Sequence, residues 1–402
     1  MNTFQKMASV LLIAGCLSSP AIAQDPPQLS DKTFRTVNKV QKWIAEEKYA
    51  YAIEKLESAI ESTKKKKYDR AVLLQQMGFL YSLREDYKQA ANYFAQALEV
   101  NALPVPVAQQ VRYSLAQLYL AEEQYQKSVN TMKAWFKVAE TTEDKPNAHA
   151  YITLASAYVQ MGDYKNAIAP TKKAISMTKD PSESWYLLLL ASHYELKQYK
   201  STAGVLKTLT SKYPQKKRYW MQLSGIYMEM NQDRNSLAAL EAAYELNLLE
   251  SEKEYLRLVN FMAYQGIPYR AAKTLKLAME QGNIEQTQKH VEKLASFYHQ
   301  AQEVDQAILA YQQAYEMSPT AKSQIRIARL MLQDKQYKVA SEYTKTYAPN
   351  ATKDQVAELQ YIKGMAHFEM KQPKLALNSM KKAASSKELR PTVSPWISFL
   401  EQ

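Results

Sequence analysis

A small residue recurs ten times along this chain, each time at the same place in a Tyr-rich, amphipathic pair of helical segments. Consecutive occurrences are separated by 33 to 39 residues. A period of this length is typical of stacked helical repeats and argues against one compact domain. Such an array presents an extended surface, which favours a function in holding another molecule. The ten residues are Ala52, Ala90, Ser128, Ala167, Ala203, Ser236, Ala271, Ala307, Ala340 and Ala376.

The repeat unit is clearest between Val291 and Pro319. Apolar or small residues there follow helical spacing in two successive segments, which we term helix A and helix B. The pattern resembles the tetratricopeptide repeat, which has a bulky residue, Leu, a small residue and Tyr on helix A, then Ala, an aromatic residue and Ala on helix B. The matching residues are Val291, Leu294, Ala295, Tyr298, Ala307, Tyr311 and Ala314.

The resemblance covers almost the whole chain and implies an all-α fold. We expect an α-solenoid over residues 33–390, a right-handed superhelix of about ten helix pairs, followed by a capping helix at 391–402. Residues 24–32 are expected to form an N-terminal extension. Three features depart from the pattern: Trp43 stands where Tyr is usual in a degenerate first helix A, Trp135 stands where helix B has its second small residue, and Pro170 falls inside a helix B, where it should cause a kink.

Residues 1–23 have the features of an export signal. A lysine precedes an apolar stretch at 7–17, and Ala-Ile-Ala at 21–23 precedes Gln24, as at a signal-peptide cleavage site. The apolar stretch is shorter than the roughly 20 residues that a membrane-spanning helix needs. We therefore expect cleavage after Ala23 and a periplasmic protein with no membrane span.

A second processing route is open at Cys16, the single cysteine of the chain. Ile13-Ala14-Gly15-Cys16 resembles a bacterial lipobox, whose cysteine is lipidated after cleavage just before it. This route would give a form anchored in the envelope by lipid. Mass spectrometry of the mature N-terminus distinguishes the two routes.

The chain is basic, with a formal net charge of +12. Such a charge favours anionic surfaces, acidic proteins or nucleic acid as partners, but it does not define a site. The one dense basic run, Lys64 to Lys67, lies between two expected helices and is interpreted as a solvated loop. Export from the cytoplasm also disfavours nucleic acid, so we expect a protein partner.

The helix A residues that point away from helix B are candidates for partner binding, because they line one face of the array. These residues are apolar in five successive repeats, which predicts a partly hydrophobic groove. Two alternatives remain: the residues pack on the next helix A, or the assumed register is wrong by one residue. The candidates are Val72, Phe79, Tyr113, Leu120, Ile152, Val159, Trp185, Leu188, Met221 and Met228.

Basic residues occupy similar helix A places toward the C-terminus. They are Lys253, Lys289, Lys322 and Arg329. An acidic partner or simple solvation would explain them, since exposed charges are common. Some tetratricopeptide proteins clamp a carboxyl terminus with a defined Lys, Asn and Arg set, but only Asn260 matches that set here, so we do not expect this clamp.

The sequence contains no arrangement of residues typical of catalysis. The five histidines are scattered and lack zinc-binding spacing, and neither a phosphate-binding glycine loop nor a nucleophile elbow occurs. We therefore expect no enzyme activity, no metal and no cofactor. The alternative is a helical-array enzyme acting on glycans, whose two carboxylates need not be close in sequence.

The leading functional hypothesis is a periplasmic scaffold that binds a segment of a partner protein. In export signal, repeat coverage and length the chain is similar to the periplasmic tetratricopeptide proteins that accompany TonB, ExbB and ExbD systems. That similarity implies support of TonB-dependent transport, with components of the TonB system as partners. The alternative within binding proteins is an adaptor for envelope assembly or peptidoglycan, favoured if Cys16 is lipidated.

Overall fold

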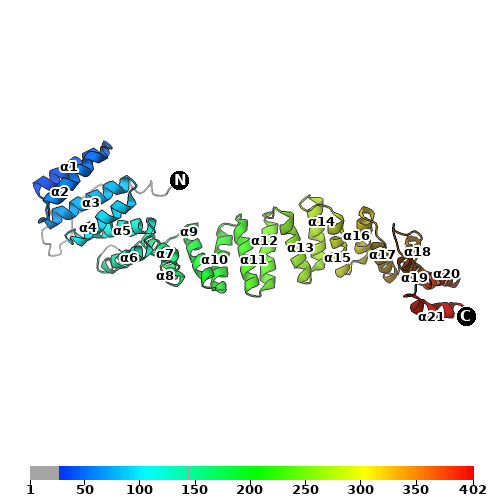
Figure 1. Ribbon diagram of the computed structural model, residues 1–402. Helices are drawn as coiled ribbons and strands as arrows, with labels where there is room; N and C mark the ends of the chain where they lie inside the picture. The colour runs from blue at the N-terminus through cyan, green and yellow to red at the C-terminus, as the bar shows by residue number, and fades with distance from the viewer. Residues whose placement is uncertain (1–26, 143–144) are drawn as a thin grey trace. The chain divides into compact units, whose positions relative to one another are not determined.

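A computed structural model describes residues 27–142 and 145–402, and within these ranges the chain forms 21 α-helices and no strand (Figure 1). The helices are α1 Asp31–Ala45, α2 Tyr49–Ser62, α3 Lys67–Leu83, α4 Tyr87–Glu99, α5 Val105–Ala121, α6 Tyr125–Ala139, α7 Ala148–Gln160, α8 Tyr164–Ser176, α9 Glu183–Glu195, α10 Tyr199–Lys212, α11 Lys217–Glu229, α12 Asp233–Glu245, α13 Glu252–Tyr264, α14 Pro268–Glu280, α15 Gln288–Gln300, α16 Val304–Met317, α17 Ala321–Gln333, α18 Tyr337–Tyr343, α19 Lys353–Glu369, α20 Pro373–Ala383 and α21 Arg390–Leu400.

These helices confirm the expected all-α repeat fold. The odd-numbered helices from α1 to α19 are the A helices, the even-numbered helices from α2 to α20 are the B helices, and α21 follows the tenth pair. The chain divides into two compact units, residues 1–209 and 210–402, with the boundary inside α10. The expected export signal and Cys16 lie outside the described residues.

The small residue of each pair lies at the crossing of helices A and B. It is the fourth residue of helix B in nine pairs, and these nine residues are 0% exposed. In the fifth pair the fourth residue of α10 is Thr202, which is 1% exposed, whereas Ala203 is the fifth residue. The expected register was therefore wrong by one residue in this pair. Thr202 fits there because its hydroxyl donates to the carbonyl of Gln198, 3.1 Å away.

Two pairs carry serine at the small position and use it to join the helices. The Ser128 hydroxyl donates to the carbonyl of Ala116, at 2.7 Å, and the Ser236 hydroxyl donates to the carbonyl of Ser224, at 2.9 Å. Both acceptors lie on helix A, twelve residues earlier. A buried hydroxyl needs such a partner, so the close approach of the two helices satisfies it.

Every turn between helices A and B contains one residue with a positive φ, five residues before the small position of helix B. An αL residue at this place ends helix A and reverses the chain. Only two of the ten are glycine, so the turn is formed mostly by residues that favour this conformation less. They are Glu47, Glu85, Glu123, Gly162, Lys197, Asn231, Gly266, Gln302, Lys335 and Lys371.

The ninth pair departs from the others in its helix B. Helix α18 has only seven residues and is followed by an irregular segment at 344–352. The side chain of Gln324, 2% exposed, supports this segment by donating to the carbonyl of Thr346 at 2.7 Å and accepting from the N–H of Ala348 at 2.8 Å. One buried amide thus replaces the backbone hydrogen bonds that a longer helix would have made.

The C-terminal helix α21 packs on the tenth pair. Val393 is fully buried in a cluster with Met380 and Ala383 of α20. The ring of Trp396 lies 5.0 Å from the ring of Phe368 on α19. The apolar side of α21 therefore covers the end of the repeat array in the second unit.

Candidate functional site

Three successive A helices of the first unit place apolar residues in two matching rows. The residues of one row stand ten positions before the positive-φ residue of the turn that follows their helix, and those of the other row stand three positions before it. In α5, α7 and α9 all six residues are apolar or aromatic. Because the offset is constant, the six residues share one face of the A helices. They are Tyr113, Leu120, Ile152, Val159, Leu187 and Tyr194.

Packing between neighbouring A helices covers part of these rows. The Tyr113 hydroxyl lies 3.3 Å from the hydroxyl of Thr153 on α7, and burial raises the pKa of the Tyr113 phenol, although this hydrogen bond opposes the rise. Leu120 and Val159 pack on the same buried cluster. The sequence-based alternative, packing on the next helix A, therefore describes part of this surface, and the rest is open to a partner.

Trp185 and Leu188 require a correction. Trp185 is 7% exposed, and its ring lies 5.5 Å from the ring of His149 on α7. Leu188 was assigned with the register that is wrong by one residue in this pair, and Trp185 lies in neither row. The correct register gives Leu187 and Tyr194, which the sequence analysis missed. Lys197 at the turn was the signal that would have identified them.

The candidates of the second pair lie in other rows. Val72 and Phe79 are half-buried, and the Phe79 ring packs edge-on against Phe94 with 5.1 Å between centroids. The residues of this pair that match Tyr113 and Leu120 are Gln75 and Ser82, which are polar. The apolar rows of the first unit are therefore continuous only from α5 to α9.

Beside Tyr113 the helices enclose a hollow of about 460 Å³. The start of α5 contributes Pro106, Gln109 and Gln110, and α6 contributes Trp135. The indole of Trp135 takes the place that a buried alanine occupies in most B helices, seven residues after the small position, as Ala97 does in α4. The side chain of Trp135 is larger than the alanine of most other B helices and forms one wall of the hollow.

Polar groups fix the wall of this hollow. The Gln109 amide donates to the carbonyl of Trp135 at 2.8 Å and accepts from Arg112. The Tyr113 ring lies 5.7 Å from the Trp135 ring, so aromatic and amide groups face the same space. A concave site with an aromatic wall and a few oriented polar groups suits one large side chain of a bound segment.

Models of the tetratricopeptide repeat match four segments of the chain: residues 83–135, 148–181, 217–248 and 292–320. The matched segments together cover less than half of the chain, and they resemble tetratricopeptide repeats. They lie in both units and include α5, α7, Trp135 and all but the first residue of the clearest repeat unit, Val291 to Pro319. Proteins of this repeat type generally mediate protein–protein interaction.

Several solved tetratricopeptide structures are similar to the chain. One is a protein from Parabacteroides merdae, with 14% identity, a TM-score of 0.38, and coverage of 75% of this chain and 98% of that chain. Another is YrrB, described as having an unusual peptide-binding site, with 14% identity, a TM-score of 0.37, and coverage of 46% and 90%. A third is MamA, with 16% identity, a TM-score of 0.35, and coverage of 42% and 93%. No curated protein matches the chain.

In the second unit the two methionine candidates lie on α11. Met221 is half-buried and packs against the core of the unit. Met228 is 47% exposed, and its sulfur accepts a hydrogen bond from Arg257 on α13 at 3.7 Å. Only Met228 of the ten sequence-based candidates is well exposed. Partner binding by these residues remains a prediction.

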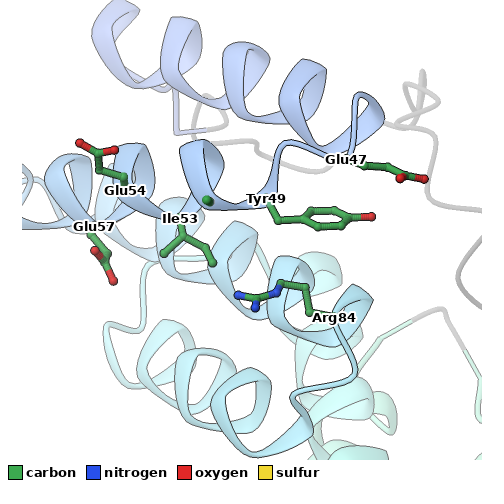
Figure 2. Close-up of a pocket in the computed structure, with 7 residues that line it drawn as sticks. Glu47, Tyr49, Ile53, Glu54, Glu57 and Arg84 are labelled. Atoms are coloured by element: carbon green, nitrogen blue, oxygen red, sulfur yellow. The ribbon is translucent and has the colours of Figure 1, made fainter.

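A second hollow of about 460 Å³ lies between α2 and the turn that follows α3. Figure 2 shows Arg84 extending toward Ile53, beside the ring of Tyr49. Glu47, Glu54 and Glu57 line the same hollow and are exposed to solvent.

The described part of the chain holds neither a cluster of metal ligands nor a membrane-spanning helix. Residues 27–142 and 145–402 contain no group of three or more His, Cys, Asp or Glu side chains placed to hold a metal ion. Within the same ranges, every helix is too short or too polar to cross a membrane. The features that remain are the apolar rows and the hollow beside Tyr113.

Proposed function

We propose that this protein is a non-catalytic periplasmic scaffold that binds a segment of a partner protein along the A helices of its first unit. The apolar rows on α5, α7 and α9 support this proposal, together with the hollow into which Tyr113 faces. The bound segment lies across the rows and inserts one large side chain beside Trp135. Half-buried aromatic residues next to a pocket are typical anchors of protein interfaces.

Matched tyrosine substitutions test this interface. Tyr194 lies in an apolar row and is 53% exposed, whereas Tyr51 lies on a helix B and is 61% exposed. We expect Tyr194→Lys to abolish capture of the partner from cross-linked periplasm and Tyr51→Lys to retain it, with the same thermal midpoint in both variants. Equal capture by the two variants would contradict binding at the apolar rows.

The export signal at 1–23 supports a periplasmic location. We expect the mature protein to begin at Gln24 and to fractionate with periplasmic proteins. A mature N-terminus at a lipidated Cys16 would instead support the envelope-anchored adaptor. The export signal, length and repeat coverage further support a role in TonB-dependent transport, which cross-linking of TonB, ExbB or ExbD to the protein would test.

A further inference from the structure

The A helices of the second unit carry a different surface from those of the first. Lys253, Lys289 and Lys322 are each the second residue of their helix, in α13, α15 and α17, and all three are exposed. One helical turn later each helix has a second cation. These are Arg257, Lys293 and Arg326. The six residues, which we call the cation rows, repeat with the period of the array.

Contacts between neighbouring A helices place the second row on one continuous surface. Lys293 Nζ donates to Asn260 Oδ1 at 3.0 Å, which joins α15 to α13. Arg326 Nη1 donates to Glu292 Oε1 at 2.9 Å, which joins α17 to α15. The cations of the second row therefore lie along the seam between successive A helices. The first row runs beside it, one helical turn away.

The first row lacks neutralising partners. The nearby glutamates are engaged elsewhere: Glu252 accepts from the N–H of Glu285 at 2.9 Å, and Glu254 accepts from Lys217 at 3.1 Å. None of the ion pairs in the described ranges involves Lys253, Lys289 or Lys322. The three lysines at equivalent places are therefore exposed and form no ion pair within the described residues.

The first row is also unfavourable for the helices that carry it. The first turn of a helix has a partial positive charge, so acidic residues stabilise this place and lysine destabilises it. The same unfavourable choice occurs in three successive A helices. Lysine is also the second residue of the B helices α18 and α20, at Lys338 and Lys374, so the distinguishing feature of the first row is its repetition along three successive A helices, each with a second cation one turn later.

We propose that the cation rows bind an acidic segment of a partner protein through its Asp and Glu side chains. This inference rests on the proposed scaffold function and names the partner chemistry of the second unit. Charge complementarity supports it, because the six cations outnumber the glutamates beside them: Glu292 pairs with Arg326, and Glu252 and Glu254 are engaged elsewhere. An acidic peptide can place neutral residues opposite these glutamates, whereas a nucleic acid backbone has a charge at every nucleotide and would meet them.

Fluorescence anisotropy with the full chain tests the proposal at about 0.15 M salt, where weak long-range attraction is screened. The probe is a labelled peptide of Glu-Ser-Gly repeats, and the reference is the same peptide with Gln in place of Glu. The site variant is Lys253→Glu, Lys289→Glu and Lys322→Glu together. The control is Lys273→Glu, Lys338→Glu and Lys374→Glu, which makes the same charge change at exposed B-helix positions of this unit.

We expect the site variant to bind the Glu peptide at least about tenfold more weakly, and the control to bind it as the unchanged protein does. The site variant should melt no lower than the unchanged protein, because glutamate suits the first turn of a helix. Equal losses in both variants, or equal binding of the Gln peptide, would overturn the proposal. Tighter binding of single-stranded DNA or of anionic vesicles would overturn it in favour of those ligands.

Failure here is distinguishable from failure of the scaffold function. If partner capture depends on Tyr194 but the Glu peptide does not bind, the cation rows are excluded as a binding site and the first unit remains the proposed one. If the Glu peptide binds but partner capture does not depend on Tyr194, the cation rows are supported and binding at the apolar rows of the first unit is contradicted.

Discussion

The ring of Phe94 lies against Gly78 where helices α3 and α4 cross. It is so close that a Cβ atom on residue 78 would overlap the ring. The tenth pair repeats the arrangement with Gly364 and Met380, but the nearest atoms there are the flexible end of a methionine at 3.0 Å. We expect Gly78→Ala to lower the free energy of unfolding by about 1 to 3 kcal/mol through overpacking. Urea unfolding of Gly78→Ala and of Gly364→Ala measures the difference in the free energy of unfolding.

Gly364→Ala is the control for this substitution. Met380 can move aside, and alanine favours the helix more than glycine by up to about 1 kcal/mol, so stability should change little or rise. Phe94→Leu should restore part of the stability lost in Gly78→Ala. Equal losses at the two glycines would show that crowding by the partner side chain is not the cause.

The turn after α5 is expected to become more stable when Glu123 is replaced by glycine. Glu123 has a φ of 58°, where a side chain costs about 1 to 2 kcal/mol. Glycine removes that cost but loses about 0.5 to 1 kcal/mol through the freedom of the unfolded chain. The thermal midpoint of Glu123→Gly should therefore rise slightly, whereas Glu122→Gly, at a φ of −85°, should lower it.

The stability contributed by Glu254 is expected to disappear in acid. Burial alone would raise the pKa of this carboxyl, but the N–H of Glu250, the Lys217 ammonium and the N–H of Ser251 together lower its pKa to about 2. A depressed pKa in the folded state stabilises the fold above the unfolded value, about 4.5, and this contribution is lost as pH falls toward 2. Urea unfolding of wild type and Glu254→Gln should converge over this range.

Lys217→Met separates the sources of this pH dependence. The variant removes the ammonium 3.1 Å from Glu254 Oε1 and keeps the two backbone donors. The acid dependence attributable to Glu254 should therefore become smaller and persist in part. An unchanged pH profile would exclude Lys217 as a source of the low pKa.

The segment at 344–352 is expected to lose its order when Gln324 is replaced by alanine. The substitution leaves the carbonyl of Thr346 and the N–H of Ala348 without their partner, at about 1 to 3 kcal/mol for a buried group. Amide hydrogen exchange should become faster in this segment. Gln333→Ala, at an exposed position of the same helix, should leave the exchange rates unchanged.

Much of the fold was predictable because the small residues mark the place where two helices must approach closely. Nine of the ten gave the correct register. The fifth pair failed because Thr202 and Ala203 are adjacent and both small enough, and only the turn at Lys197 distinguishes them. The short α18 was not predicted, since it depends on hydrogen bonds made by Gln324, which lies 19 to 24 residues away from its partners.

The candidate sites show the same division. Hydrophobic patterning named apolar residues on the A helices of the first unit, whose role in partner binding stays a prediction, and the unusual Trp135 was visible in the sequence. The hollow beside it was not, because its walls come from separate helices. The polar contacts Lys293–Asn260 and Arg326–Glu292 join residues 33 and 34 positions apart. Sequence pattern alone does not show which of many exposed polar residues meet in this way.

The eight left-handed turn residues that are not glycine are exposed, so they can be substituted without changing the buried core of their unit. Each turn is closed by the backbone, as by the Glu85 N–H bond to the Ser82 carbonyl and the Gln302 N–H bond to the His299 carbonyl. At the eight turns that have no glycine, the side chain is not needed to close the turn and can be exchanged for a label or a tether. Within each unit the left-handed turn positions recur every 33 to 39 residues of chain, so labels placed on neighbouring turns are spaced by one repeat.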